Sequence, residues 1–197
     1  MTADPPGYTA SNNFAVSWSG ATDSASLVNQ YCYKLSSSGS ETCTTEASAS
    51  GALAYQTGTN SFYVRSKDTA GNYASDYANA AFYYSSIAPG APQNMRVTYP
   101  VGTSSNTVNE FAFAWDAPGT YYGQQTGLRY YYSFNALPTA NNVNEIGLSV
   151  TYLSQDSYAT QKGQNTLYVV AKDEAGNIDY STYASVNFTA DTSAPGI

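Results

Sequence analysis

One pattern occurs twice in this sequence and restricts the fold more than any other feature. Residues 62–72 read FYVRSKDTAGN, and residues 167–177 read LYVVAKDEAGN. Each copy begins with alternating apolar and polar residues, which is typical of a β-strand with one buried face. The pattern therefore predicts two strands with a core-facing side. The residues predicted to face the core are Phe62, Val64, Ser66, Leu167, Val169 and Ala171.

Each copy ends in Asp-x-Ala-Gly-Asn, which is typical of a tight turn. An aspartate side chain can accept hydrogen bonds from the backbone N–H groups just after it, and glycine adopts a positive φ without steric cost. Because another strand-like run follows, each copy is predicted to form a β-hairpin. The predicted turn residues are Asp68, Gly71 and Asn72 in the first copy and Asp173, Gly176 and Asn177 in the second.

Three Pro-Gly pairs mark equivalent positions of an internal repeat, at residues 6–7, 89–90 and 195–196. The repeat predicts two full units, and we expect the chain to be a piece of a longer array. The expected parts are a β-sandwich over residues 1–87, a second β-sandwich over residues 88–192, and the start of a following repeat or a linker over residues 193–197.

Short strand-like runs fill both units, and no stretch has a helical periodicity of useful length. The alternating runs 14–18 and 111–115 each end in a tryptophan, so we expect Trp18 and Trp115 to be central buried residues. Strands separated by turns in this way predict an all-β fold of two β-sandwiches in tandem. Further strands are expected over 30–35, 41–45, 52–55, 77–82, 93–99, 129–134, 148–153 and 183–188, with a short or absent first strand at 8–12 and a loop at 141–145.

The two cysteines, Cys32 and Cys43, lie in runs predicted to form neighbouring strands. A zinc site is excluded because the chain has no histidine and two thiolates cannot fill four coordination positions. Two free buried thiols are the alternative, but we favour a disulfide because the surroundings are charge-poor and rich in serine and threonine, as in secreted proteins. Closing this loop would stabilise the unit by about 3 kcal/mol in the chain-entropy model. Alternation places Tyr31 and Tyr33 inward and Cys32 outward.

The tryptophan of the second strand, the tyrosine-rich third strand and the hairpin VRSKDTAGN at 64–72 resemble bacterial fibronectin type III modules. Bacterial immunoglobulin-like surface repeats share the same hairpin ending. The resemblance covers nearly the whole chain, because both units carry the three features in the same order. It implies two tandem fibronectin-III-like sandwiches of seven strands each, used as a spacer, stalk or accessory module. The partners that it implies are neighbouring repeats of the same polypeptide.

Composition argues against several classes of function. The net charge of −7 disfavours a nucleic-acid contact surface, and no apolar run is long enough for membrane insertion. Without histidine, a histidine-based catalytic triad is impossible. We therefore expect no enzyme activity, no catalytic residue, no cofactor and no metal. Asp4 and Asp191 resemble linker aspartates that bind calcium in some bacterial repeats, but the junction at 84–88 has no acidic residue.

Tyrosine is unusually frequent, with 20 among 197 residues. Exposed aromatic rings can stack on sugar rings and are enriched at recognition surfaces, so glycans or another surface protein are possible partners. The expected exposed positions are Tyr121 and Tyr122 in a loop and Tyr131 on the outer face of a strand. The competing interpretation is that tyrosine simply replaces valine on strands, because its β propensity is high. Asn187 begins a glycosylation sequon and is expected to face outward.

Together these features predict a non-catalytic extracellular structural repeat, a spacer or stalk from a larger secreted or cell-surface protein. The alternative is a carbohydrate- or surface-binding adhesin module that uses exposed tyrosines. The segment 87–92 contains Pro89 and Pro92, and a proline favours an extended conformation in the residue before it. We therefore expect this segment to hold the two units end to end.

Overall fold

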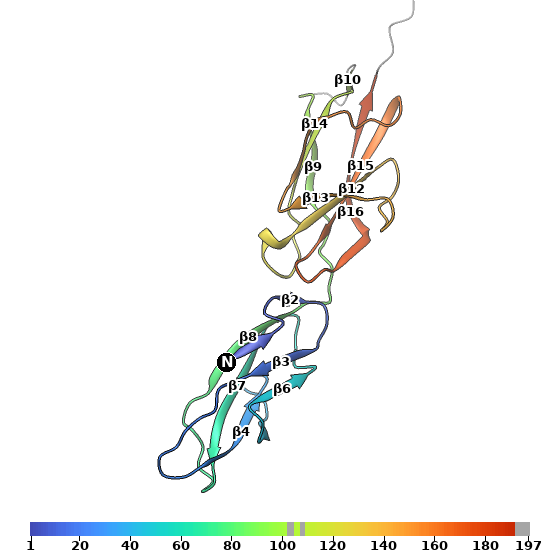
Figure 1. Cartoon of the computed structure of the whole chain (residues 1–197). Helices are drawn as coiled ribbons and strands as arrows, with labels where there is room; N and C mark the ends of the chain where they lie inside the picture. The colour runs from blue at the N-terminus through green and yellow to red at the C-terminus, as the bar shows by residue number, and fades with distance from the viewer. Residues whose placement is uncertain (102–104, 107–108, 192–197) are drawn as a thin grey trace, which may run out of the picture. The chain divides into compact units, whose positions relative to one another are not determined.

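The computed structural model describes residues 1–101, 105–106 and 109–191, in two compact units (Figure 1). Unit 1 is Met1–Ser86 and unit 2 begins at Ile87, one residue before the expected boundary. Over the described residues the structure is almost entirely β, and its single helical element is the 3-10 turn η1 at Gln125–Gly127. No helix in these ranges is long and apolar enough to cross a membrane.

Unit 1 consists of two β-sheets. The smaller sheet has the strand order β1-β3-β6, and the larger has the order β2-β8-β7-β4-β5. Neighbouring strands are antiparallel except β2 and β8, which are parallel. The strands are β1 (Thr2–Asp4), β2 (Tyr8–Thr9), β3 (Phe14–Ser17), β4 (Val28–Lys34), β5 (Thr42–Thr44), β6 (Ser48–Gly51), β7 (Gly58–Asp68) and β8 (Ala78–Tyr84).

Unit 2 repeats this topology strand for strand. Its smaller sheet has the order β14-β11-β9 and its larger sheet the order β10-β16-β15-β12-β13, again with one parallel pair, β10 and β16, among the described strands. The strands are β9 (Gln93–Tyr99), β10 (Ser105–Asn106), β11 (Phe111–Asp116), β12 (Arg129–Phe134), β13 (Asn144–Leu148), β14 (Tyr152–Asp156), β15 (Gly163–Lys172) and β16 (Ile178–Ala190).

A single apolar core lies between the two sheets of each unit. In unit 1, Phe14 and Val16 of β3 pack with Phe62 and Val64 of β7 and with Phe82 of β8. These residues come from both sheets, which makes the unit a β-sandwich. The expected fold class, two tandem fibronectin-III-like β-sandwiches in an all-β chain, is confirmed.

The core of unit 2 is built from the corresponding strands. Phe111, Phe113 and Trp115 of β11 pack with Leu167 and Val169 of β15, and every one of these side chains is buried. The period-two pattern of the repeated stretch therefore identifies the core face, because alternate residues of a strand point to opposite sides. The remaining buried members of this core are Leu128, Tyr130, Leu153, Ala171, Phe188 and Ala190.

The two tryptophans are not equivalent. Trp115 is only 1% exposed, as expected, but Trp18 is half-buried, so the expectation of a central core position is wrong for Trp18. Its ring lies beside the core of unit 1, with its centroid 5.7 Å from those of Tyr31 and Phe62. The reason is strand length, since β3 ends one residue before Trp18 whereas β11 continues through Trp115.

The strand expected over 52–55 does not form, and β6 lies just before it. Gly51 has a φ of +118°, and the chain turns there, with the Leu53 N–H donating to the Gly51 carbonyl at 2.9 Å. Leu53 is 6% exposed and reaches the core from this turn. Its apolar character therefore reflects packing and not membership of a strand.

In unit 2, the strand expected over 148–153 is replaced by the end of β13, a turn and the start of β14. The loop expected over 141–145 contains the first residues of β13. Both β13 and β14 are edge strands, and β13 contains no fully buried residue. A strand that buries few side chains has little alternation of apolar and polar residues, so a search for that alternation does not detect it.

The first strand of unit 1 is divided between the two sheets, where a short or absent strand was expected at 8–12. β1 pairs with β3, and β2 pairs in parallel with β8. Pro5 and Pro6 lie between β1 and β2. Because proline has no N–H to donate, these residues end the ladder with β3 and let the chain cross to the other sheet.

Candidate functional site

In unit 1, the side chain of Asp68 holds the hairpin turn. It accepts hydrogen bonds from the Asn72 backbone N–H at 2.8 Å, the Asn72 side-chain amide at 2.9 Å and the Ser26 hydroxyl at 2.9 Å. The bond from the Asn72 side chain is the largest cause of the lowered pKa of Asp68. Gly71 has a φ of +94°, a conformation that strains any residue with a side chain.

The same turn recurs in unit 2. The buried Asp173 accepts hydrogen bonds from the Asn177 backbone N–H at 2.7 Å and from the Asn177 side-chain amide at 2.9 Å, and Gly176 has a φ of +92°. Both aspartates therefore cap their turns, as the repeated Asp-x-Ala-Gly-Asn pattern predicts. In the described part of the chain, no group of three or more His, Cys, Asp or Glu side chains is placed to hold a metal ion.

Besides the Asp68 turn, unit 1 has a second turn held by the side chain of one residue, the fully buried Asn60, which was not predicted. We call the two side-chain-to-turn networks, around Asp68 and around Asn60, clamps. The Asn60 Oδ1 accepts hydrogen bonds from the backbone N–H groups of Tyr55 at 3.0 Å and Gln56 at 3.2 Å. Its Nδ2 donates to the carbonyls of Gln56 at 2.9 Å and Gly58 at 3.0 Å. One side chain thus satisfies four backbone groups of the turn that leads into β7.

Asn165 makes the corresponding bonds in unit 2, to the N–H groups of Thr160 and Gln161 and the carbonyls of Gln161 and Gly163. It also accepts a hydrogen bond from the Asn135 side chain at 2.8 Å. A signal was present in the sequence, because Gln-x-Gly-x-Asn occurs at 56–60 and again at 161–165. This second repeat has the same spacing as the repeated hairpin.

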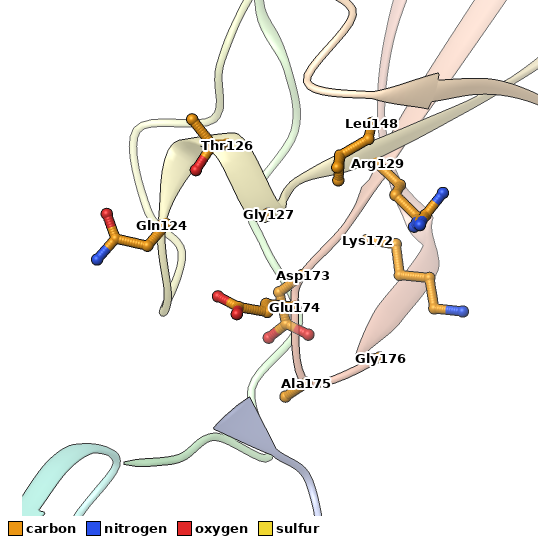
Figure 2. Close-up of a pocket in the computed structure, with 10 residues that line it drawn as sticks. All are labelled: Gln124, Thr126, Gly127, Arg129, Leu148, Lys172, Asp173, Glu174, Ala175 and Gly176. Atoms are coloured by element: carbon orange, nitrogen blue, oxygen red, sulfur yellow. The ribbon is translucent and has the colours of Figure 1, made fainter. Parts of the chain in front are cut away.

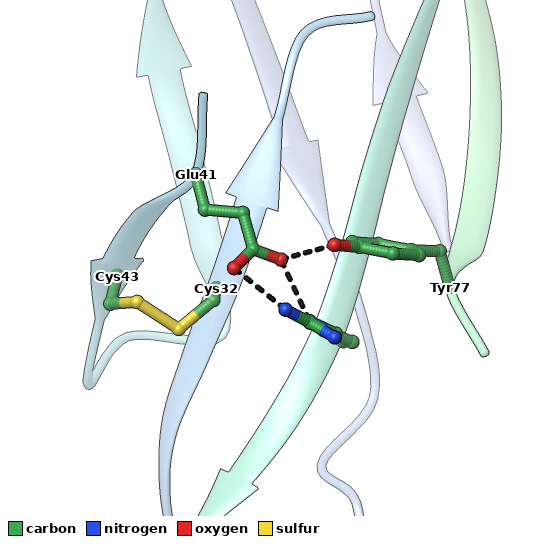
Figure 3. The surroundings of a disulfide bond; sticks show 5 residues. Cys32, Glu41, Cys43 and Tyr77 are labelled. Atoms are coloured by element: carbon green, nitrogen blue, oxygen red, sulfur yellow. Dashed lines mark hydrogen bonds and ion pairs between the residues drawn. A yellow bond between two sulfur atoms is a disulfide. The ribbon is translucent and has the colours of Figure 1, made fainter. Parts of the chain in front are cut away.

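A disulfide joins Cys32 of β4 to Cys43 of β5, two residues that lie directly opposite each other in the ladder (Figure 3). Tyr31 and Tyr33 pack against the core, so Cys32 lies on the outer face of the sheet. Cys32 is nevertheless fully buried on that face. The bond links the edge strand β5 covalently to the sheet.

Beside the disulfide, Glu41, which directly precedes β5, bonds to Arg65 of β7 and to Tyr77, which directly precedes β8 (Figure 3). Its carboxylate accepts two hydrogen bonds from Arg65 of β7, from Nε at 2.7 Å and from Nη2 at 2.8 Å. Tyr77 donates its hydroxyl hydrogen to the same carboxylate. The bond from Arg65 is the largest cause of the lowered pKa of Glu41, and the bond to Glu41 is the largest cause of the raised pKa of Tyr77.

Basic side chains and tyrosine rings alternate on this outer face. The Arg65 guanidinium lies 4.2 Å from the centroid of Tyr73 and 4.9 Å from that of Tyr77. The Lys34 ammonium lies 4.3 Å from the Tyr77 centroid, and the Lys67 ammonium lies 5.2 Å from the Tyr73 centroid. Such contacts are attractive because the ring face is negative. The Lys34 ammonium also lies 5.8 Å from the Tyr63 centroid. The cation–tyrosine face is defined by Lys34, Tyr63, Arg65, Lys67, Tyr73 and Tyr77.

Unit 2 has an open depression of about 480 Å³ (Figure 2). It lies between η1 and the hairpin turn, with Arg129 and Lys172 on one side and Glu174 nearby. Arg129 pairs with Glu145 at 2.6 Å. Both signs of charge line the depression, and nothing in its geometry selects a particular ligand.

The three tyrosines expected to be exposed differ in their surroundings. Tyr122 is 37% exposed, but Tyr121 is half-buried and packs against the core of unit 2, which corrects the expectation for Tyr121. Tyr131 is also half-buried, which corrects the expectation for Tyr131, and it donates to Glu145 at 3.3 Å. Over the described residues, no ring contact or hydrogen bond joins these tyrosines into one site. Asn187 of the sequon is exposed, as expected.

No family model matches the chain, and no curated protein matches it. Solved structures with similarity include the central fibronectin-III array of RIM-binding protein, at 14% identity and a TM-score of 0.36, over 93% of this chain and 65% of that one. The fibronectin(III)-like modules of Clostridium thermocellum CbhA match at 15% identity and a TM-score of 0.36, over 97% of this chain and 94% of that one. The chain thus spans 65% of the length of the first structure.

Proposed function

We propose that the two units are non-catalytic structural modules that act as a spacer or stalk in a secreted or cell-surface protein. The observation that carries the proposal is the pair of clamps present in both units. The buried polar side chains Asn60, Asp68, Asn165 and Asp173 all bind the backbone or side chains of their own turns. Buried polar groups used in this way fix the shape of a module, because each lost bond would leave an unsatisfied group.

The disulfide supports the extracellular part of the proposal. Structural disulfides persist in oxidising compartments and are rare where glutathione and thioredoxin keep thiols reduced. The bond between Cys32 and Cys43 joins directly opposed residues in the interior of the ladder. A module exposed to the outside of a cell gains from such a bond, since it limits opening of the edge strand.

The segment 87–92 supports the spacer role. Pro89 and Pro92 restrict it, and each favours an extended conformation in the alanine before it. A short, restricted segment limits the relative motion of the modules that it joins. We therefore propose that it keeps them apart and that neighbouring repeats of the same polypeptide are their partners.

Small-angle X-ray scattering on the whole chain tests the spacer role. A single globule of this length would have a radius of gyration of about 16 Å, and we expect a clearly larger value together with a long maximum dimension. A variant with Pro89→Gly and Pro92→Gly should broaden the distance distribution, and because both prolines are buried, circular dichroism must first show that unit 2 keeps its fold. A compact profile for the natural sequence would contradict the spacer role.

A further inference from the structure

Unit 1 has a notch of about 210 Å³ beside Trp18, which is half-buried. We call it the tryptophan notch, and its aromatic lining consists of Trp18 and Tyr31, whose ring centroids lie 5.7 Å apart. Val64 of the core also lines it, as do Arg65 and Asp76, which carry opposite charges. Aromatic-lined grooves bind segments that contain proline, because a proline is already rigid and loses little entropy on binding. The lining therefore suits an uncharged segment with a proline.

In unit 2, a segment of the chain itself lies at the place that corresponds to this notch. β1 and β9 correspond, because each pairs with the strand that leads to the tryptophan of its unit. Residues 89–92 directly precede β9, and Met1, which lines the notch, directly precedes β1. Both prolines of 89–92 are buried, and the Gly90 N–H donates at 2.8 Å to the carbonyl of Thr120, in the loop that follows Trp115. The indole of Trp115 is only 1% exposed.

The sequence Ala-Pro-Gly occurs at 88–90 and again at 194–196. The first occurrence is already bound within unit 2, where a Cβ at Gly90 would lie 2.7 Å from the Thr120 Oγ1, so the contact requires a glycine. The second occurrence supplies the same proline and glycine in the same order, and residues 192–197 contain no charged side chain. Residues 194–196 therefore have the chemistry that the tryptophan notch suits.

We propose that residues 194–196 of one chain bind in the tryptophan notch of a second copy, with the ring of Pro195 against Trp18 and Tyr31. The donor segment and the acceptor notch are different parts of the sequence, so the contact is heterologous and joins copies head to tail. Because the segment is uncharged, burial of apolar surface drives the association, which should depend little on salt. This interaction between separate chains goes beyond the proposed role as a spacer.

Titration of the whole chain with a peptide tests the proposal, with the tryptophan side chains as reporters. The chain has two tryptophans, so isotope-labelled protein gives two indole N–H signals in NMR spectra, which the variant Trp18→Phe assigns. The probe is a peptide of residues 192–197, acetylated and amidated so that terminal charges do not contribute. We expect the Trp18 signal to shift and saturate with a dissociation constant of about 1 mM, because few atoms make contact. The Trp115 signal is the internal control and should not shift.

Matched peptides identify the group that is recognised. A peptide with Pro195→Ala should bind about fivefold or more weakly, because it loses the rigid apolar ring, whereas Ser193→Ala should change the affinity less than about twofold. In the whole chain, Pro195→Ala should weaken the self-association measured by sedimentation equilibrium, and Ser193→Ala should not.

Three results would overturn the proposal. The first is a Trp18 signal that does not shift at a peptide concentration about tenfold above the expected dissociation constant, or that shifts no more than the Trp115 signal. The second is equal binding of the Pro195→Ala peptide, because the proline would then not be recognised. The third is a single mass at every chain concentration up to about 1 mM, because residues 194–196 would then not join two copies.

Discussion

The two units carry the same hairpin but differ on the outer face of the sheet that contains it. At corresponding positions of β7 and β15, unit 1 has Arg65 and unit 2 has Val170. Arg65 binds Glu41 and two tyrosine rings, whereas Val170 is fully buried and is paired across the ladder with Tyr131 and Tyr183. The inner face of the hairpin must fill a core, while the outer face can be covered by ionic or by apolar contacts.

The difference extends to how each unit is stabilised. Unit 1 has the smaller set of fully buried core residues within the described chain, and it contains the disulfide, whereas ion pairs occur in both units. Unit 2 has the larger core and no cysteine. Small domains bury a smaller fraction of their surface and often need covalent links. The comparison indicates that the disulfide of unit 1 compensates for a smaller core.

The largest expected difference concerns the tryptophans. Trp115→Ala should destabilise unit 2 by about 3–5 kcal/mol, whereas Trp18→Ala should destabilise unit 1 by less than about 3 kcal/mol, because Trp18 is only half-buried. Urea denaturation followed by circular dichroism measures both, and fluorescence of the remaining tryptophan reports the untouched unit. Equal costs would contradict the assignment of Trp18 to the margin of its core.

Removal of the disulfide should affect unit 1 alone. Replacing Cys32 and Cys43 by serine should lower the free energy of unfolding of unit 1 by about 2–4 kcal/mol, because the unfolded chain regains freedom. Tryptophan fluorescence in a Trp115→Phe background follows this transition, since Trp18 then reports unit 1. Reductant added to the natural sequence should give the same shift. If the transition of unit 2 moved equally, the two units would not be independent.

Removing the buried asparagine side chain should destabilise both units. Asn60→Ala and Asn165→Ala should each cost about 1–3 kcal/mol, because each leaves buried backbone groups unsatisfied. The cost at Asn165 should be the higher of the two, since it also bonds to Asn135. Thermal melting of both variants measures these costs, and Asn141→Ala at an exposed position should change stability by less than about 0.5 kcal/mol. A clamp variant as stable as this control would disprove the structural role.

The smallest expected effect concerns Glu41→Gln, which should destabilise unit 1 by less than about 1 kcal/mol at neutral pH. Folding lowers the pKa of Glu41, mainly through the hydrogen bond from Arg65. Its contribution is therefore present above the pKa of an unfolded glutamate, about 4.3, and is lost as the pH falls through the lower folded value. Denaturant titrations of both proteins at several pH values should converge in acid. A difference that grows in acid would refute this assignment.

Much of the architecture could be predicted because it follows from neighbouring residues. The alternation in 62–72 and 167–177 predicts which side chains enter the core, and the turn tails predict the positive φ of Gly71 and Gly176. The edge strand β13 could not be predicted in this way. It is held by pairing with β12, and it lacks the alternate buried apolar residues from which a strand can be predicted.

The amino-acid sequence alone determines the hairpins, their turns and the core-facing residues, because burial on one side of a strand and φ at a glycine depend on adjacent positions. The cation–tyrosine face depends on folding. Lys34, Glu41, Arg65 and Tyr77 belong to separate segments, and they meet because the ladder places β4 and β8 on either side of β7. Contacts across strands depend on register, and register is established only when the whole sheet assembles around its core.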